Sequence, residues 1–366
     1  MNTQELHTIV SHFEIEARAV EIQPLGAGFI NDTFTVRTDG NAPDYILQRK
    51  NRQIFPDVPE MMDNIVAVTD HIRKKVVAAG GDPQREVLTV IFTYDGKPYH
   101  IHEGEYWTMC LYIDGSVTYE RADTPALAYK GGEGIGKFQS QLADFTTPLA
   151  ETIKGFHNIR FRFEQWDASV ARDAAGRCKD LQQEIGWIES RRKEMSEFWA
   201  LVENGTIPMR VTHNDTKISN ILFDKNGEVL CVIDLDTVMS STSLNDFGDA
   251  IRTFGNTGAE DDRNLANVSL DMAMFRAYTE GYLSQRKATM TQSELDWLAF
   301  GARYIVYEQV LRFLMDYIDG DTYYRIASPD HNLVRTHAQY ALLCSIEEHY
   351  DQMCETVKEL AGRTTA

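Results

Sequence analysis

The chain has 366 residues, of which 43% are hydrophobic and 25% charged, a composition typical of folded globular proteins and incompatible with wholesale disorder. Its 55 acidic residues outnumber its 36 basic ones, and the resulting net charge of −19 repels nucleic acid and anionic lipid. We therefore expect neither nucleic acid nor a membrane as a partner.

The N-terminus and the cysteines indicate a cytoplasmic protein. No apolar stretch approaches the roughly 20 residues that span a bilayer, and the first residues lack the basic and apolar segments of a secretory signal. The five cysteines are dispersed and form no Cys-x-x-Cys pair. Neither a disulfide framework nor a zinc site is expected.

Strand-like segments dominate the first 113 residues. They are residues 20–24, 33–38, 45–49, 88–92 and 106–113, with turns at Asp39-Gly40 and Asp95-Gly96. One helix is expected between them, from about residue 59 to 77, because apolar residues recur there at intervals of three and four.

Helical patterns dominate after residue 115. They cover residues 125–145, 164–203, 267–286 and 292–318 and recur towards the C-terminus. The clear β element of this part is a hairpin of residues 221–223 and 229–233 around Asn226-Gly227. We predict an α+β protein with a small antiparallel β lobe (1–110), a hinge (111–115) and a large, mainly helical lobe (116–366).

The segment 211–223 and the strand that follows it carry the residues with the clearest chemistry. They place Asp215, Asn220 and Asp234 in fixed order. Phosphoryl transfer needs a carboxylate that orients the acceptor hydroxyl and oxygen ligands that hold magnesium. Turn capping explains single members of this set but not all three. We therefore predict Asp215 as the catalytic base and Asn220 and Asp234 as magnesium ligands.

The hairpin leaves two registers open. A two-residue loop places Asn220 opposite Ile233, and a three-residue loop places it opposite Asp234. In either register both predicted metal ligands lie at the open end of one hairpin. His213, just upstream, is interpreted as a buttress of the loop rather than a proton carrier.

The tripeptide Asp246-Phe247-Gly248 spells the magnesium-binding motif of protein kinases, but it lies too far beyond Asn220 for that role. We expect Asp246 and Asp249 to brace the loop of Asp215, or to cap a helix that begins near Asp249.

A Gly-x-Gly turn at Gly26 and Gly28 joins two strand-like segments and is a candidate cover for phosphates. The chain has neither a Walker A loop nor a Gly-x-Gly-x-x-Gly motif that opens a helix, which excludes P-loop and Rossmann folds. His100 and His102 alternate onto one strand face, and we interpret them as exposed strand histidines rather than metal ligands.

Several longer segments resemble the aminoglycoside phosphotransferase and choline kinase relatives of protein kinases, over almost the whole chain. These segments are residues 26–31, 45–48, 54–57, 210–217, 233–237, 246–252, 276–281 and 331–336. The string Thr212-His-Asn-Asp-Thr-Lys217 and the C-terminal segments favour the sugar kinases within that group.

The resemblance implies a protein-kinase-like fold of two lobes and transfer of the ATP γ-phosphoryl group, with Mg²⁺ as cofactor, to the anomeric hydroxyl of N-acetylglucosamine or N-acetylgalactosamine. It implies nucleotide contacts at Gly26, Gly28, Asn31, Gln48, Cys110 and Ile113. It implies sugar contacts at Asp215, Asp236, Thr237, Arg312 and Tyr323.

The sequence departs from the wider kinase pattern at Gln48, which replaces the strand lysine that pairs with phosphates. One interpretation pairs Gln48 with Asn64 of the following helix; the other lets Arg49 or Lys50 reach the nucleotide. Two alternative functions stay open, a kinase for another alcohol such as homoserine, choline or an aminoglycoside, and a pseudokinase that binds without turnover.

Overall fold

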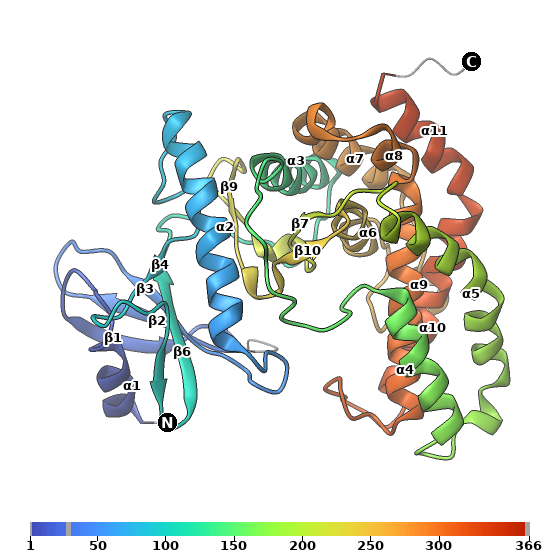
Figure 1. The fold of residues 1–366 in the computed structure, drawn as a ribbon, viewed down its shortest axis with the longest axis horizontal. Helices are drawn as coiled ribbons and strands as arrows, with labels where there is room; N and C mark the ends of the chain where they lie inside the picture. The colour runs from blue at the N-terminus through green and yellow to red at the C-terminus, as the bar shows by residue number, and fades with distance from the viewer. Residues whose placement is uncertain (1, 27–30, 363–366) are drawn as a thin grey trace. The chain divides into compact units, whose positions relative to one another are not determined.

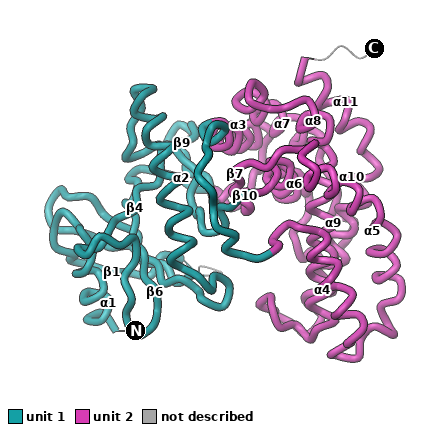
Figure 2. The backbone as a smooth tube through the Cα atoms, viewed as in Figure 1, with its two compact units in different colours: residues 1–118, 141–154, 220–240 teal, residues 119–140, 155–219, 241–366 magenta. Residues whose placement is uncertain are grey.

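The computed structural model describes residues 2–26 and 31–362, and its contacts divide the chain into two compact units (Figure 2). Unit 1 comprises residues 1–118, 141–154 and 220–240, and unit 2 comprises residues 119–140, 155–219 and 241–366. The units are defined by packing, and the functional division into two lobes with a hinge at 111–115 stays a prediction.

Unit 1 is built on an antiparallel sheet with the strand order β1-β2-β3-β6-β4, in which β5 also pairs with β6. Its strands are β1 (Ala19–Pro24), β2 (Asp32–Thr38), β3 (Tyr45–Arg49), β4 (Val90–Ile91), β5 (His100–His102) and β6 (Glu105–Leu111). The expected strand at 88–92 is shorter than predicted, because only Val90 and Ile91 pair with β6. The expected strands at 20–24, 33–38 and 45–49 are confirmed, and the one at 106–113 ends two residues early, at Leu111.

The two faces of this sheet have different surroundings. One face packs against α1 (Thr3–Val10) and forms a core that includes Ile9, Leu47 and Met109. Side chains alternate along a strand, so Ile46 and Gln48 of β3 point to the opposite face. That second face carries the pocket described below.

Helix α2 (Val58–Ala78) confirms the helix predicted at 59–77. Asp57 precedes its first residue, and the Asp57 side chain accepts a hydrogen bond from the backbone nitrogen of Glu60 and caps the first turn. Its buried residues recur at helical spacing and include Met62, Ile65 and Ile72.

The hairpin of unit 1 consists of β8 (Ile221–Phe223) and β9 (Val229–Val232). At its tip Asp224 N donates to Glu228 O, which encloses a three-residue loop, but a bulge between Leu222 and Phe223 shifts the register back by one residue. As a result Ile233 N donates to Asn220 O at the open end, the pairing expected of the shorter loop.

Unit 2 is mainly helical (Figure 1). Its helices are α3 (Pro125–Gln141, whose last residue belongs to unit 1), α4 (Ile159–Arg172), α5 (Gln182–Glu203), α6 (Ser243–Phe254), α7 (Met272–Arg286), α8 (Gln292–Asp296), α9 (Leu298–Ile318), α10 (His331–Glu348) and α11 (Tyr350–Leu360). The remaining short strands of the chain are β7 (Arg210–Thr212) and β10 (Met239–Ser241). Single 3₁₀ turns lie at η1 (Cys178–Asp180), η2 (Ile218–Asn220), η3 (Leu235–Thr237), η4 (Leu265–Asn267) and η5 (Lys287–Thr289).

The single helical segment predicted at 164–203 is wrong. Helix α4 ends at Arg172, because Asp173 takes a left-handed conformation with φ 41°. Asp173 Oδ1 then accepts hydrogen bonds from the backbone nitrogens of Arg177 and Cys178, which holds the chain in a turn before α5. An aspartate that bonds to nearby backbone groups competes with helix formation in this way.

Helices α6 and α9 pack with their backbones in close approach. A Cβ atom added to Gly248 of α6 would lie 2.1 Å from Gly301 O, and one added to Gly301 would lie 2.3 Å from Leu244 O. Only glycine allows this distance, so the pair of glycines sets how deeply α6 is seated against α9.

These elements confirm the expected fold class, an antiparallel N-terminal sheet followed by a mainly helical C-terminal part. Within residues 2–26 and 31–362, none of the helices combines the length and the apolar character needed to cross a bilayer.

Candidate active site

A cavity of about 350 Å³ lies within unit 1, on the sheet face opposite the α1 core. Much of its wall is apolar, and the residues that line it include Ile46, Met62, Ile65, Leu88, Val90, Leu222, Ile233 and Leu235. Polar groups join them from strand β3, from the hairpin and from η3: Gln48, Lys50, Asn220, Asp234 and Asp236. Apolar walls with a few placed polar groups are typical of small-molecule sites.

Six residues predicted from the sequence line this one cavity. They are Gln48, Cys110, Ile113, Asn220, Asp234 and Asp236. Asn31 is buried and donates a hydrogen bond from Nδ2 to Asp236 Oδ2 at 2.7 Å. Gly26 has φ 65°, a conformation that favours glycine, whereas Gly28 lies outside the described residues.

The two predicted metal ligands flank the hairpin of β8 and β9. Asn220 ends η2 directly before β8, and Asp234 follows β9. Asp234 is left-handed, with φ 61° and ψ 55°, and this conformation turns the chain from the strand into η3. Both residues line the cavity, and their amide and carboxylate oxygens are donors that suit Mg²⁺.

A buried ion pair in this cavity was not predicted. Lys50 Nζ lies 2.7 Å from Asp236 Oδ1 and 2.8 Å from Oδ2, and it also donates to Gln48 Oε1 at 2.7 Å. The two partners are 186 residues apart, so no local sequence pattern could reveal their contact. The only sequence signal was the basic pair Arg49 and Lys50 beside the unusual Gln48.

The proposed pairing of Gln48 with Asn64 is wrong. The Asn64 amide bonds to backbone groups instead: Nδ2 donates to Ala150 O and Val238 O, and Oδ1 accepts from Ala150 N. Gln48 bonds to Lys50 and donates to Thr33 Oγ1.

The Cys110 thiol forms part of the cavity wall without being reactive. Burial raises its pKa to about 12, although the nearby Lys50 ammonium opposes this rise. Because the thiolate is the reactive form of cysteine, Cys110 behaves at neutral pH as a small apolar side chain.

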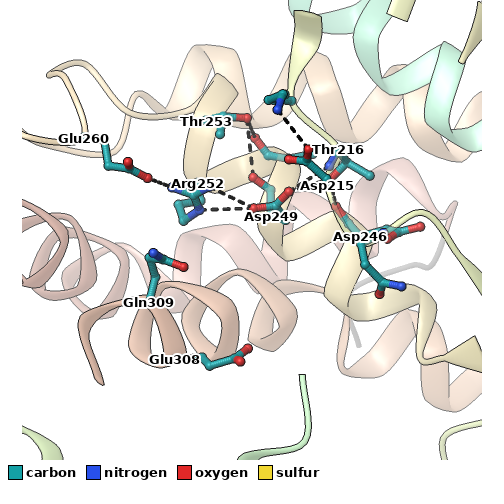
Figure 3. Close-up of polar contacts among 12 residues, drawn as sticks. Asp215, Thr216, Asp246, Asp249, Arg252, Thr253, Glu260, Glu308 and Gln309 are labelled. Carbon is teal, nitrogen blue, oxygen red and sulfur yellow. Dashed lines mark hydrogen bonds and ion pairs between the residues drawn. The ribbon is translucent and has the colours of Figure 1, made fainter. Parts of the chain in front are cut away.

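Asp215 belongs to unit 2, in the loop between β7 and η2 (Figure 3). Its carboxylate is partly exposed and forms an ion pair with Lys217, whose Nζ lies 2.9 Å from Oδ2. Its backbone nitrogen donates to Nδ1 of His213, which is fully buried. This contact agrees with the interpretation of His213 as a buttress of the loop.

Two carboxylates of α6 hold the loop by its backbone (Figure 3). Asp246 accepts hydrogen bonds from His213 N at 2.9 Å and from Asn214 N at 2.7 Å. Asp249 accepts one from Thr216 N at 2.8 Å. The expected bracing role is thus confirmed, whereas the capping role is wrong, because α6 begins at Ser243 and is capped by Thr242.

The bracing continues outward from the loop. Arg252 donates to Asp249 Oδ1 from Nε and Nη2, at 3.1 and 3.0 Å, and from Nη1 to Glu260 at 2.6 Å (Figure 3). Gln139 of α3 donates to Asp246 Oδ2 at 2.7 Å. The carboxylates that hold the loop are therefore held themselves, which restricts the positions that Asp215 can take.

The predicted sugar contacts are divided between the units. Asp236 and Thr237 belong to η3 of unit 1, whereas Asp215, Arg312 and Tyr323 belong to unit 2. Within unit 2 the Arg312 guanidinium lies over the rings of Phe156, Tyr323 and Tyr324, at 5.3 to 5.9 Å from their centroids. The assignment of these residues to a sugar stays a prediction.

Glu308, on the same helix as Arg312, is the centre of a buried cluster. Glu308 accepts from Arg162 and pairs with His157 Nδ1 at 2.7 Å. Burial alone would raise the pKa of Glu308, but the charges and hydrogen bonds of His157, Arg162 and Arg312 lower it to about 2.

Known proteins share this fold. The profile of the phosphotransferase enzyme family (APH) matches residues 21–284, well over half of the chain. An aminoglycoside phosphotransferase from Alicyclobacillus acidocaldarius superposes with a TM-score of 0.58 at 14% identity, covering 96% of this chain and 97% of that one. Spectinomycin phosphotransferase APH(9)-Ia, solved with ADP and spectinomycin, gives 0.56 at 14% identity, covering 99% and 98%.

Choline kinase LicA from Streptococcus pneumoniae superposes with a TM-score of 0.50 at 11% identity, covering 89% of this chain and 94% of that chain. At such identities the likeness concerns the fold. It confirms the expected fold, that of aminoglycoside phosphotransferases and choline kinases.

Proposed function

The chain belongs to the phosphotransferase enzyme family, and from this premise we propose that it is an ATP- and magnesium-dependent N-acetylhexosamine 1-kinase. The proposed reaction moves the γ-phosphoryl group of ATP to the anomeric hydroxyl of N-acetylglucosamine or N-acetylgalactosamine. The observation that carries the proposal is the cavity of unit 1, which combines an apolar wall with Lys50, Asn220 and Asp234.

ATP fits the chemistry of this cavity. The apolar side chains of the sheet, α2 and the hairpin suit a flat base, and residues 110–113 form part of the same wall. The cation Lys50 and the predicted metal ligands suit the phosphates.

Asn220 and Asp234 are the residues proposed to hold magnesium. Both residues line the cavity, and their side chains carry the oxygen donors that this ion prefers. Magnesium bound there would neutralise charge on the triphosphate.

Asp215 is proposed as the base that orients the acceptor hydroxyl and takes its proton. A side chain in this role must be held in place, because a misplacement of about 1 Å can cost on the order of 10²-fold in rate. The hydrogen bonds from the loop backbone to Asp246 and Asp249 supply that restraint. The ion pair with Lys217 further limits the carboxylate itself.

The choice of a sugar as acceptor rests on the segments that resemble sugar kinases, above all Thr212-His-Asn-Asp-Thr-Lys217. Arg312 and Tyr323 are proposed contacts of the sugar in unit 2, with Asp236 and Thr237 in unit 1.

An acceptor panel tests the proposal. Purified protein is supplied with magnesium and ATP, and ADP release is measured with N-acetylglucosamine, N-acetylgalactosamine, homoserine, choline and spectinomycin. We expect the two N-acetylhexosamines to give the highest kcat/KM. A higher value for any of the other alcohols would replace the sugar assignment, and binding of ATP without ADP release over any acceptor would favour a pseudokinase.

A further inference from the structure

Gln48 occupies the position of the strand lysine found in other kinases, but a lysine two residues later, Lys50, lies in the wall of the cavity. Lys50 directly follows β3, and its backbone nitrogen still donates to Tyr106 O of β6. The alternation of side chains along β3 therefore places Ile46, Gln48 and Lys50 on one face, and all three residues line the cavity. Arg49 points to the other face and pairs with Asp32 at the surface. A shift of two residues keeps a side chain on the same face and moves it by about 6.6 Å along the strand.

The ammonium group of Lys50 is buried and held on two sides. Lys50 is only 3% exposed, and its Nζ bonds to both carboxylate oxygens of Asp236 and to Gln48 Oε1. Asn31 adds a hydrogen bond to Asp236 and accepts one from Asn51 N, next to Lys50 in sequence. The pair is therefore fixed from both β3 and η3.

A buried ion pair of this kind contributes little to stability, because desolvation of both charges offsets their attraction. Because the pair lies in the wall of a cavity, it can bind a ligand there. Lys50 Nζ bonds to Gln48 and Asp236, whereas Asn64 of helix α2 bonds to backbone groups. The carboxylate that holds the cation comes instead from η3, two residues after Asp234.

From this geometry we infer that Lys50 binds the phosphates of ATP in place of the missing strand lysine, with Asp236 as the residue that positions its ammonium. The inference rests on the proposed function, because it takes ATP as the ligand of the cavity. It gives Asp236 a structural partner within unit 1 in addition to its predicted contact with the sugar.

The test compares two ligands that differ only in phosphates. Dissociation constants for adenosine and for ATP with magnesium are measured by calorimetry on wild type, Lys50→Met and the double variant Lys50→Met/Asp236→Asn. The double variant removes both charges, so it leaves no uncompensated carboxylate that could unfold the protein. Arg49→Met, which removes a neighbouring cation from the opposite face, is the matched control.

We expect the double variant to bind ATP about 10- to 100-fold more weakly, the usual contribution of a hydrogen bond to a charged group. Adenosine should bind within about twofold of wild type, because it carries no phosphate. Arg49→Met should bind both ligands like wild type.

Two results would overturn the inference. If the double variant bound ATP as tightly as wild type, Lys50 would serve only to neutralise Asp236. If adenosine and ATP lost affinity equally, its role would be to shape the cavity. A wild-type protein that bound neither ligand would instead overturn the proposed function, and this assignment with it.

Discussion

The polar side chains of the candidate site in unit 1 hold one another in the wall of a cavity, whereas those around Asp215 in unit 2 hold the backbone of a loop. Lys50 and Asp234 are arranged along a space that can take a ligand. Asp246 and Asp249 accept hydrogen bonds from backbone amides of the loop. Changes along the cavity should therefore alter the affinity for ATP, and changes around Asp215 should alter turnover and stability.

The largest expected effect is that of Asp215→Asn, which should lower turnover without changing the affinity for ATP. Asp215→Asn should lower kcat by about 10²- to 10⁴-fold, the usual contribution of a general base. Its affinity for ATP should stay within about twofold of wild type, because the cavity belongs to unit 1. Steady-state kinetics and calorimetry on one preparation measure both, with the exposed Asp70→Asn as control. Near-normal kcat in Asp215→Asn would end its assignment as the base.

The next effect concerns the support of the loop. Asp246→Ala leaves His213 N, Asn214 N and the Gln139 amide without their buried acceptor. We expect a loss of about 2 to 4 kcal/mol in the free energy of unfolding, measured with denaturant. Glu280→Ala, on an exposed face of α7, should leave the stability close to wild type. Unchanged stability in Asp246→Ala would contradict the bracing role.

The close packing of α6 against α9 predicts a smaller loss of stability. A second glycine, in α5, provides a control that should change stability in the opposite direction. Gly248→Ala places a Cβ atom 2.1 Å from Gly301 O and should cost about 1 to 3 kcal/mol of stability through overpacking. Gly186 of α5 has no heavy atom within 4 Å of such a Cβ, so Gly186→Ala should add about 0.5 to 1 kcal/mol. Equal effects of the two variants would rule out close packing as the reason for Gly248.

The smallest effect appears only in acid. The pKa of Glu308 is lowered to about 2 in the folded protein from an ordinary 4.5. Its stabilising contribution is therefore complete above about pH 4.5 and is lost as pH falls towards 2. In this window Glu308→Gln should show a shallower loss of stability than wild type, by at most about 1.4 kcal/mol for each pH unit.

Denaturant unfolding at several pH values measures the slope for Glu308→Gln. The exposed Glu355→Gln serves as control and should keep the slope of wild type. A Glu308→Gln variant with that same slope would show that the charges around Glu308 do not stabilise its carboxylate.

Much of the fold follows from local patterns. Strands β1, β2 and β3 were placed to within one residue, because alternation and the Asp39-Gly40 turn define their ends. The hairpin register was left open for a physical reason: its loop is of the longer type, and the bulge at Leu222 and Phe223 restores the pairing of the shorter one.

The site could be predicted only in part. Asn220 and Asp234 are separated by one hairpin, so their spacing carries information about their neighbourhood. The contact of Lys50 with Asp236 joins residues 186 positions apart and depends on tertiary packing. The break at Asp173 was equally hidden, since it depends on hydrogen bonds that a periodic pattern does not reveal.

The most direct test of the central claim locates the phosphate on the product. Wild-type protein is incubated with magnesium, ATP and N-acetylglucosamine, and the phosphorylated sugar is examined by phosphorus and proton nuclear magnetic resonance. The account predicts a phosphorus signal coupled to the anomeric proton, formed in the same amount as ADP and at least about 10²-fold more slowly with Asp215→Asn. Phosphate on any other sugar oxygen, or ADP without a phosphorylated sugar, would contradict it.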